Sequence, residues 1–143
     1  MSTPIPAGKY NIKNLASGST LDLALANPTE GTLVQGWHAN GSEGQKWILK
    51  YDTGSTNFIT LQNSATMTYV SFTGVGDCVA VIGSQVSRLL QPTKIDTNTY
   101  ILAAASQPNY VLDILDGKPE DGRPVLLKTG KGVTSQKWVF TSV

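Results

Sequence analysis

The tripeptide Gln-Lys-Trp occurs twice in this chain of 143 residues, at residues 45–47 and 136–138. The dipeptide Leu-Asp repeats with the same shift of 91 residues, at residues 21–22 and 112–113, and glycine and valine positions between the two motifs also align without a gap. Chance rarely produces such agreement. An internal duplication is therefore the strongest constraint on the fold, because repeated units pack as copies of one structural element.

A degenerate third copy is expected midway between the two. Half of the shift places its glutamine near residue 91, where Gln91 stands, and "ITLQN" at residues 59–63 echoes "YNIKN" at residues 10–14. This middle copy has Ser71 in place of the aspartate and Thr93 in place of the tryptophan. The chain is thus predicted to contain three repeats of about 46 residues, with approximate boundaries at 8–52, 53–97 and 98–143.

Short alternating segments between turn residues predict an all-β protein. The best helix candidate, Ile101–Ser106, stops before Pro108 after barely two turns. Three β units that cannot each bury an apolar face are expected to pack around a pseudo-threefold axis and to close a barrel, which removes exposed sheet edges. The two repeated tryptophans are then predicted to be core residues whose indole N–H groups are satisfied locally.

The composition excludes several classes of function. A net charge of +1 does not indicate a basic surface for nucleic-acid binding, and no apolar run approaches the length of a membrane span. The single cysteine, Cys78, precludes an internal disulfide and is predicted to be a small buried core residue. The first ten residues carry no signal-peptide pattern, so a cytoplasmic location is predicted.

Catalytic, metal and cofactor sites are not predicted. A single histidine and a single cysteine make no metal cluster, and the spacing of His38 and Cys78 does not indicate a catalytic pair. The glycine-rich stretch at residues 74–83 is not followed by a helix that could receive a phosphate. The acidic residues of "DGKPEDG" at residues 116–122 have the pattern of a solvated turn, not of paired catalytic carboxylates.

Taken together, the two Gln-Lys-Trp motifs, the two Leu-Asp motifs, the threefold spacing and the Gly-x-x-Val-x-x-Trp pattern at residues 31–37 resemble the ricin-B-like lectins. The resemblance covers essentially the whole chain, and the absence of disulfides and of a signal is similar to the mushroom members of that family. It implies a single β-trefoil domain over residues 1–143. It also implies binding of glycans and glycoproteins with terminal β-galactose or N-acetylgalactosamine, in lactose-type or LacdiNAc-type disaccharides.

Galactose recognition requires an aromatic face against the C–H patch of the sugar and a carboxylate that accepts bonds from neighbouring hydroxyls. In the family pattern these roles fall on Trp37 and Asp22. Plant members often have asparagine before the glutamine, where this chain has Gly44. The usual amide contact to the sugar is therefore expected from Asn40 instead. The complete set of carbohydrate-binding residues that the resemblance implies is Asp22, Gln35, Trp37, His38, Asn40 and Gln45.

Structural explanations for these residues remain open. Trp37 also fits a half-buried strand aromatic, Asp22 a turn carboxylate and His38 an ordinary surface histidine. The third repeat has Lys128 opposite Trp37, and the middle repeat is expected to place Ile82 there. Because neither residue offers a flat aromatic face, one working site per chain is predicted.

A single shallow sugar site binds in roughly the mM to µM range, so avidity requires more than one site and favours a homodimer. A role in defence is expected, with action on extracellular glycans after release or ingestion. The chief alternative is a β-trefoil protease inhibitor that acts through exposed loops, although the repeated Gln-x-Trp motif argues against it. A heparin-binding growth-factor-like trefoil is disfavoured by the low net charge.

Overall fold

The computed structural model of the chain describes residues 4–143 and consists of strands joined by turns and short 3-10 helices. The strands are β1 (Gly8–Asn14), β2 (Thr20–Leu23), β3 (Thr32–Trp37), β4 (Trp47–Tyr51), β5 (Ile59–Asn63), β6 (Tyr69–Ser71), β7 (Val79–Ala80), β8 (Ile82–Ser84), β9 (Leu90–Asp96), β10 (Thr99–Ala104), β11 (Gln107–Ile114), β12 (Arg123–Thr129) and β13 (Trp138–Ser142). Four 3-10 turns connect them: η1 (Ala24–Ala26), η2 (Glu43–Gln45), η3 (Leu115–Gly117) and η4 (Thr134–Gln136).

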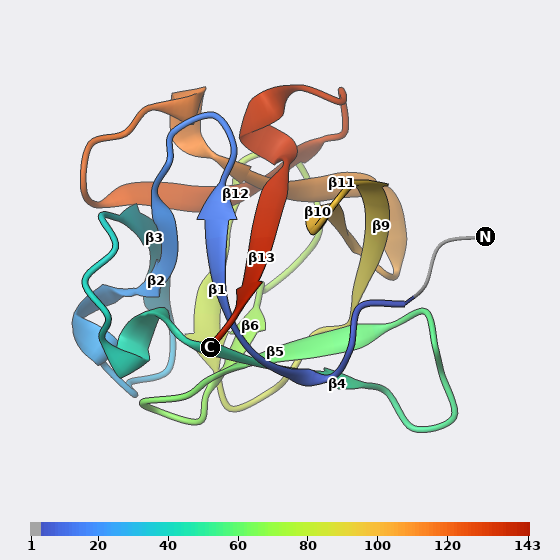
Figure 1. Ribbon diagram of the computed structural model, residues 1–143, viewed down its shortest axis with the longest axis horizontal. Coiled ribbons are helices and arrows are strands. Elements are labelled where there is room, and N and C mark those ends of the chain that lie inside the picture. The colour runs from blue at the N-terminus through green and yellow to red at the C-terminus, as the bar shows by residue number, and fades with distance from the viewer. Residues whose placement is uncertain (1–3) are drawn as a thin grey trace.

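Six of the strands in residues 4–143 close a ring of antiparallel pairs. The order is β1–β4–β5–β9–β10–β13, and β13 returns to β1 over Tyr10–Asn14. Figure 1 shows β1 and β13, from opposite ends of the chain, side by side in the centre of the view. Ring closure leaves the barrel without a free sheet edge, as the sequence predicted.

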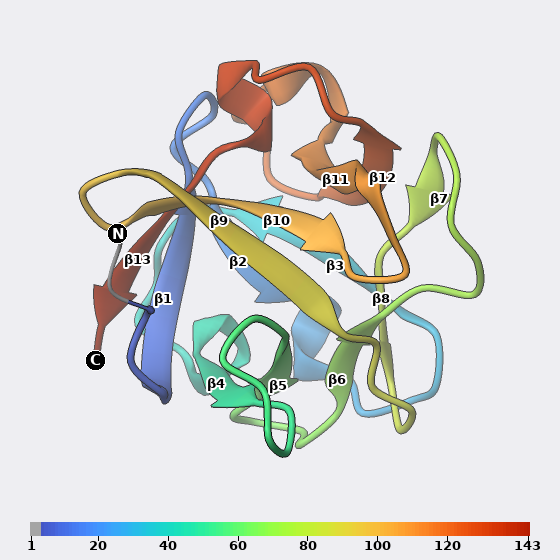
Figure 2. The same ribbon diagram turned by 90° about the vertical axis from the view of Figure 1, so that its right-hand side faces the viewer.

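Three hairpins cover one end of this barrel: β2–β3, β6–β8 and β11–β12. They are joined to one another, since β3 pairs with both β8 and β12, and the short strand β7 adds to β12. Figure 2 shows β11 and β12 at the top and β7 projecting beside them. A closed barrel with a triangular set of hairpins is a β-trefoil, so the predicted fold class is confirmed.

The repeated tryptophans lie in the core, as predicted. Trp47 is 0% exposed and its Nε1 donates to the carbonyl of Leu21 over 2.9 Å. Trp138 is 1% exposed and donates to the carbonyl of Leu112 over 3.1 Å. Each indole therefore ties a barrel strand to the first strand of a hairpin, and no polar atom of the pair is left unsatisfied.

The one helix candidate is a strand, and one local prediction was wrong. The segment Ile101–Ser106 lies largely in β10, where Ala103 and Ala104 pair with β9 and β11, so tertiary pairing overrides helix propensity. Cys78 is exposed instead of buried. Its backbone has φ +65° and its N–H bonds to the carbonyl of Leu127, the turn position that Gly31 and Gly122 fill in the other repeats.

A ring of three carboxylates links the hairpins. Each acid lies four residues before a buried valine and accepts a backbone N–H from a neighbouring hairpin. The pairs are Glu30 with Gln85, Asp77 with Thr129, and Asp121 with His38, at 3.0, 2.7 and 2.8 Å. Hydrogen bonds are the main cause that lowers the pKa of all three carboxyls. Their contribution to stability is therefore present above the unfolded-state pKa and is lost as the pH falls through the folded-state pKa.

Within residues 4–143 no helix is long and apolar enough to cross a membrane. The same residues contain no group of three or more His, Cys, Asp or Glu side chains arranged to hold a metal ion.

Trp47→Phe and Trp138→Phe should each lower the free energy of unfolding by about 2–4 kcal/mol, because each leaves a buried carbonyl unpaired and a small cavity. Urea unfolding monitored by circular dichroism measures the change. Trp37→Phe is the control: Trp37 is half-buried at the surface, so its replacement should change stability by less than about 1 kcal/mol. Equal losses at all three positions would contradict the assigned roles.

Candidate functional site

The first hairpin places one carboxylate beneath a surface cavity. Asp22 lies in β2 and is 7% exposed. Gln35 Nε2 donates to Asp22 Oδ1 over 3.1 Å, and Gln45 Nε2 donates to Oδ2 over 2.9 Å. A carboxylate has about four acceptor positions, so each oxygen keeps capacity for a further hydrogen bond. The two amides thus orient Asp22 without saturating it.

Burial is the main cause that raises the pKa of Asp22 above the ordinary value of 3.8. The hydrogen bonds from Gln45 and Gln35 act in the opposite direction, the charge of Asp121 raises the pKa further and His38 lowers it. The Asp22 carboxyl group therefore lies in a partly desolvated position, where charge-assisted hydrogen bonds from a ligand to the carboxylate are stronger than in water.

Gln45 also fixes the loop over the cavity. Its Oε1 accepts the N–H of Asn40 over 3.0 Å, and its Nε2 donates to the carbonyl of His38 over 2.8 Å. At the outer end of the loop, Asp121 accepts both the backbone N–H and Nδ1 of His38, at 2.8 and 2.7 Å. One buried amide and one surface carboxylate therefore hold the segment that follows Trp37.

Trp37 ends β3 and is half-buried, with its ring tilted by 32° against the His38 ring at a centroid distance of 5.9 Å. Gly122 lies behind it: a Cβ at that glycine would be 3.9 Å from the indole. Together with Asp22 the indole borders a cavity of about 330 Å³, whose lining comprises Asp22, Leu23, Leu25, Ala26, Gln35, Trp37, Asn40, Ser42 and Gly44.

The structure brings together four of the six residues that the sequence singled out, Asp22, Gln35, Trp37 and Asn40, as lining of this cavity. The other two lie outside the lining. Gln45 is 1% exposed and supports Asp22 from within, whereas His38 is an exposed residue held by Asp121.

Sequence reasoning missed the wall formed by Leu25 and Ala26, and it missed Asp121, whose segment was interpreted as a solvated turn. The shared position of Glu30, Asp77 and Asp121, four residues before a valine, was the signal that could have found Asp121.

The third repeat keeps the support and loses the aromatic. Gln136 donates to Asp113 and to the Thr129 carbonyl and accepts the N–H of Lys131, as Gln45 does in the first repeat. Lys128 pairs with Val111 as Trp37 pairs with Thr20, which agrees with the expected alignment. Its Nζ lies 3.7 Å from the Cys78 Sγ.

In the middle repeat the predicted alignment was off by two residues. Tyr69 pairs with Ser84 as Thr20 pairs with Trp37, so Ser84 occupies the place of the aromatic. Ile82 pairs with Ser71 and therefore takes the place of Gln35. The loop lengths of the two repeats differ, and only strand pairing fixes the register.

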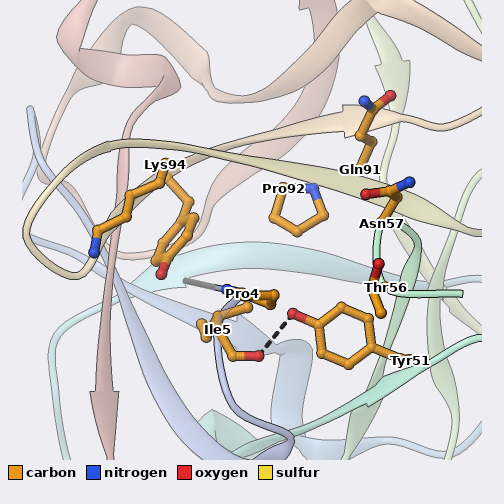
Figure 3. Close-up of a pocket in the computed structure, with 9 residues that line it drawn as sticks. Pro4, Ile5, Tyr51, Thr56, Asn57, Gln91, Pro92 and Lys94 are labelled. Atoms are coloured by element: carbon orange, nitrogen blue, oxygen red, sulfur yellow. Dashed lines mark hydrogen bonds between the residues drawn. The ribbon is translucent and has the colours of Figure 1, made fainter. Parts of the chain in front are cut away.

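Another hollow, of about 140 Å³, lies where the ends of β4, β9 and β10 meet the segment before β1 (Figure 3). There the Tyr51 hydroxyl points at the carbonyl of Ile5 and donates to it over 2.7 Å. Asp and Glu are absent from the lining residues, which all lie within the described chain. This hollow has no carboxylate that could accept bonds from sugar hydroxyls, so it lacks the chemistry of the first-repeat cavity.

Comparison with known protein families shows which family the chain belongs to. Residues 2–83 match the family described as ricin-type beta-trefoil lectin domain-like. The chain belongs to this lectin family. Its architecture is accordingly that of a carbohydrate-binding β-trefoil domain, and the predicted family is confirmed.

Solved structures agree along the whole chain. The Rhizoctonia solani agglutinin is 32% identical, with a TM-score of 0.93 and 100% of both chains covered. The designed 3-fold symmetric protein ThreeFoil is 22% identical over 95% of this chain and 99% of its own, with a TM-score of 0.88, and shares the fold.

The Macrolepiota procera ricin B-like lectin, solved in complex with lactose, is 19% identical over 99% of this chain and 100% of its own, with a TM-score of 0.86. The sequence pattern suggested a close likeness to this parasol mushroom protein. At that identity the comparison shows a shared fold, and not a closer relationship.

Gln45→Leu should lower the free energy of unfolding by about 2–4 kcal/mol, because it leaves the Asn40 N–H and part of the buried Asp22 carboxylate without partners. The matched variant Gln136→Leu removes the same contacts in the third repeat and should have a similar effect on stability. Chemical denaturation of both variants tests this. A loss below about 0.5 kcal/mol at Gln45 would show that water replaces the amide and that the network is not structural.

Proposed function

We propose that this protein is a lectin that binds terminal β-galactosides and N-acetylgalactosamine-terminated glycans in the first-repeat cavity. The observation that carries the proposal is the combination of a partly desolvated carboxylate, Asp22, and a half-buried indole, Trp37, in one cavity. This pair supplies the two groups that galactose recognition needs, a hydrogen-bond acceptor and an aromatic platform.

Each group has a definite part in the proposed complex. The indole covers the C–H face of the sugar, a contact of about 1–2 kcal/mol from apolar area. Asp22 accepts hydrogen bonds from adjacent hydroxyls. The side-chain Oδ1 of Asn40 already accepts the Ser42 N–H, so the side-chain NH₂ of Asn40 is the group able to donate to a sugar oxygen. An epimer that leaves these groups unpaired is rejected.

The relatives support this choice of sugar. The Macrolepiota procera lectin was solved with lactose and the earthworm R-type lectin C-half with N-acetylgalactosamine. The Rhizoctonia solani protein, at 32% identity, is an agglutinin. The first repeat alone combines carboxylate and aromatic, so we propose one galactose site per chain.

Asp22→Asn should weaken lactose and N-acetylgalactosamine binding by about 10- to 100-fold, because it removes the charge that strengthens the hydroxyl bonds. Asp113→Asn is the matched control from the third repeat and should bind both sugars like the unaltered protein. Isothermal titration calorimetry gives the affinities and thermal unfolding confirms that both variants fold. Equal weakening in both variants would contradict a first-repeat site.

Affinity should also depend on pH in a direction set by Asp22. A proton and a sugar hydroxyl compete for the same carboxylate, and burial raises the pKa of Asp22 above 3.8. Binding should therefore be full near neutral pH and should begin to fall at a higher pH than an ordinary aspartate would dictate. Calorimetric titrations in matched buffers, with thermal unfolding at each pH, measure this. A pH-independent affinity down to the acid unfolding transition would exclude the carboxylate as acceptor.

Several wider features belong to the same proposal. The protein acts by binding and not by catalysis, a homodimer supplies avidity for surface glycans, and a cytoplasmic store is released or ingested to act in defence. Sedimentation with and without multivalent galactosides tests the oligomer. If the unaltered protein ignores every galactoside on a glycan array, the protease-inhibitor alternative takes precedence and an inhibition assay becomes the decisive measurement.

A further inference from the structure

Leu25 occupies an unusual position on the rim of the first-repeat cavity. Leu25 is 94% exposed, the highest value among the large apolar residues of the described chain, residues 4–143. Its backbone is left-handed, with φ +55°, and Ala26 beside it has φ +48°. This conformation costs an L-residue with a Cβ about 1–2 kcal/mol, and non-glycine residues seldom adopt it in succession.

The third repeat makes the same turn with residues suited to it. The shift of 91 residues carries Leu25 onto Asp116 and Ala26 onto Gly117, whose φ values are +57° and +61°. Aspartate tolerates the left-handed region and glycine adopts it without strain. The fold thus requires the turn in both repeats, but it does not require leucine. A strained, solvent-exposed leucine at the rim of a cavity is an observation from which a functional role can be inferred.

The turn is held against the cavity by close packing. A Cβ at Gly44 would be 3.2 Å from the Ala26 Cβ, so the glycine before the Gln-Lys-Trp motif lets the turn approach the loop. Leu25 and Ala26 line the same cavity as Trp37 and Asp22. An apolar wall therefore completes a site whose other members are an aromatic ring and a polar anchor.

We propose that Leu25 is a specificity-determining residue that contacts the methyl of the 2-acetamido group and so favours N-acetylgalactosamine over galactose. This inference rests on the proposed galactoside site. The cavity of about 330 Å³ lies at the lower end of small-molecule sites, which suits one sugar ring with a small apolar substituent better than a second ring. The acetamido methyl is such a substituent, whereas a bare hydroxyl gains nothing from a leucine.

Calorimetry with galactose and N-acetylgalactosamine tests the assignment. Burying one methyl is worth about fourfold in affinity, so Leu25→Gly should lower the ratio of N-acetylgalactosamine affinity to galactose affinity by about that factor. The same variant should raise the melting temperature, because glycine relieves the left-handed strain. Leu25→Asn, which tolerates the same backbone and adds no charge, should reproduce the loss. Leu33→Asn is the control, since Leu33 is 48% exposed and lies outside the cavity lining.

The outcomes separate this inference from the proposal beneath it. If the unaltered protein binds neither sugar, the proposed function fails and the role of Leu25 fails with it. If both sugars bind and Asp22→Asn weakens both, but the Leu25 variants keep the original affinity ratio, only the role of Leu25 is overturned. An equal loss for both sugars in the Leu25 variants would place Leu25 against the ring itself and would also overturn the acetamido assignment.

Discussion

The structure depends on a pair of buried side-chain hydrogen bonds that join the two repeated motifs to each other. In the first repeat Trp47 bonds to the Leu21 carbonyl and Gln45 to the Asp22 carboxylate. The third repeat forms the corresponding pair from its own Gln-Lys-Trp and Leu-Asp. Tryptophan and glutamine are two residues apart at the start of a barrel strand. The same short segment therefore bonds both to the hairpin backbone, through the indole, and to the hairpin carboxylate, through the amide. An unpaired polar atom in such a position is strongly unfavourable, so each pair stabilises the repeat that contains it.

The first and third repeats share the hydrogen bonds that hold their aspartates, and they differ in the residues that border the cavity. The Asp–Gln–loop network is the same in the first and third repeats, so it does not by itself distinguish the first repeat. The two repeats differ at the aromatic position, where one has Trp37 and the other Lys128, and beside the carboxylate, where Gln35 is replaced by Leu126. Glu30, Asp77 and Asp121 make the same contact between neighbouring repeats. Through Asp121, the position of the first-repeat loop depends on the third repeat.

Backbone strain marks where a repeat departs from what its turn prefers. Cys78 occupies a left-handed position that Gly31 and Gly122 fill elsewhere, and Leu25 one that Asp116 fills. Both substitutions oppose the conformational preference of the chain, because a Cβ crowds the following carbonyl in this region. They differ in setting. Leu25 borders the cavity with an indole and a carboxylate, whereas Cys78 lies beside Lys128 in the repeat without the aromatic.

The sequence by itself determined the all-β class, the repeat and the burial of its tryptophans, since these follow from a period and from the spacing of apolar residues. The resemblance to the ricin-B-like lectins also predicted that Asp22 and Trp37 lie together, and both residues line the first-repeat cavity. Tertiary structure decided the rest. Only strand pairing placed Ser84, and not Ile82, opposite Tyr69. Asp121 meets His38 across 83 residues of chain, and the exposure of Leu25 follows from a turn that no propensity predicts. Partners in contacts between repeats cannot be identified from the spacing within one repeat, because these contacts form only when the barrel closes.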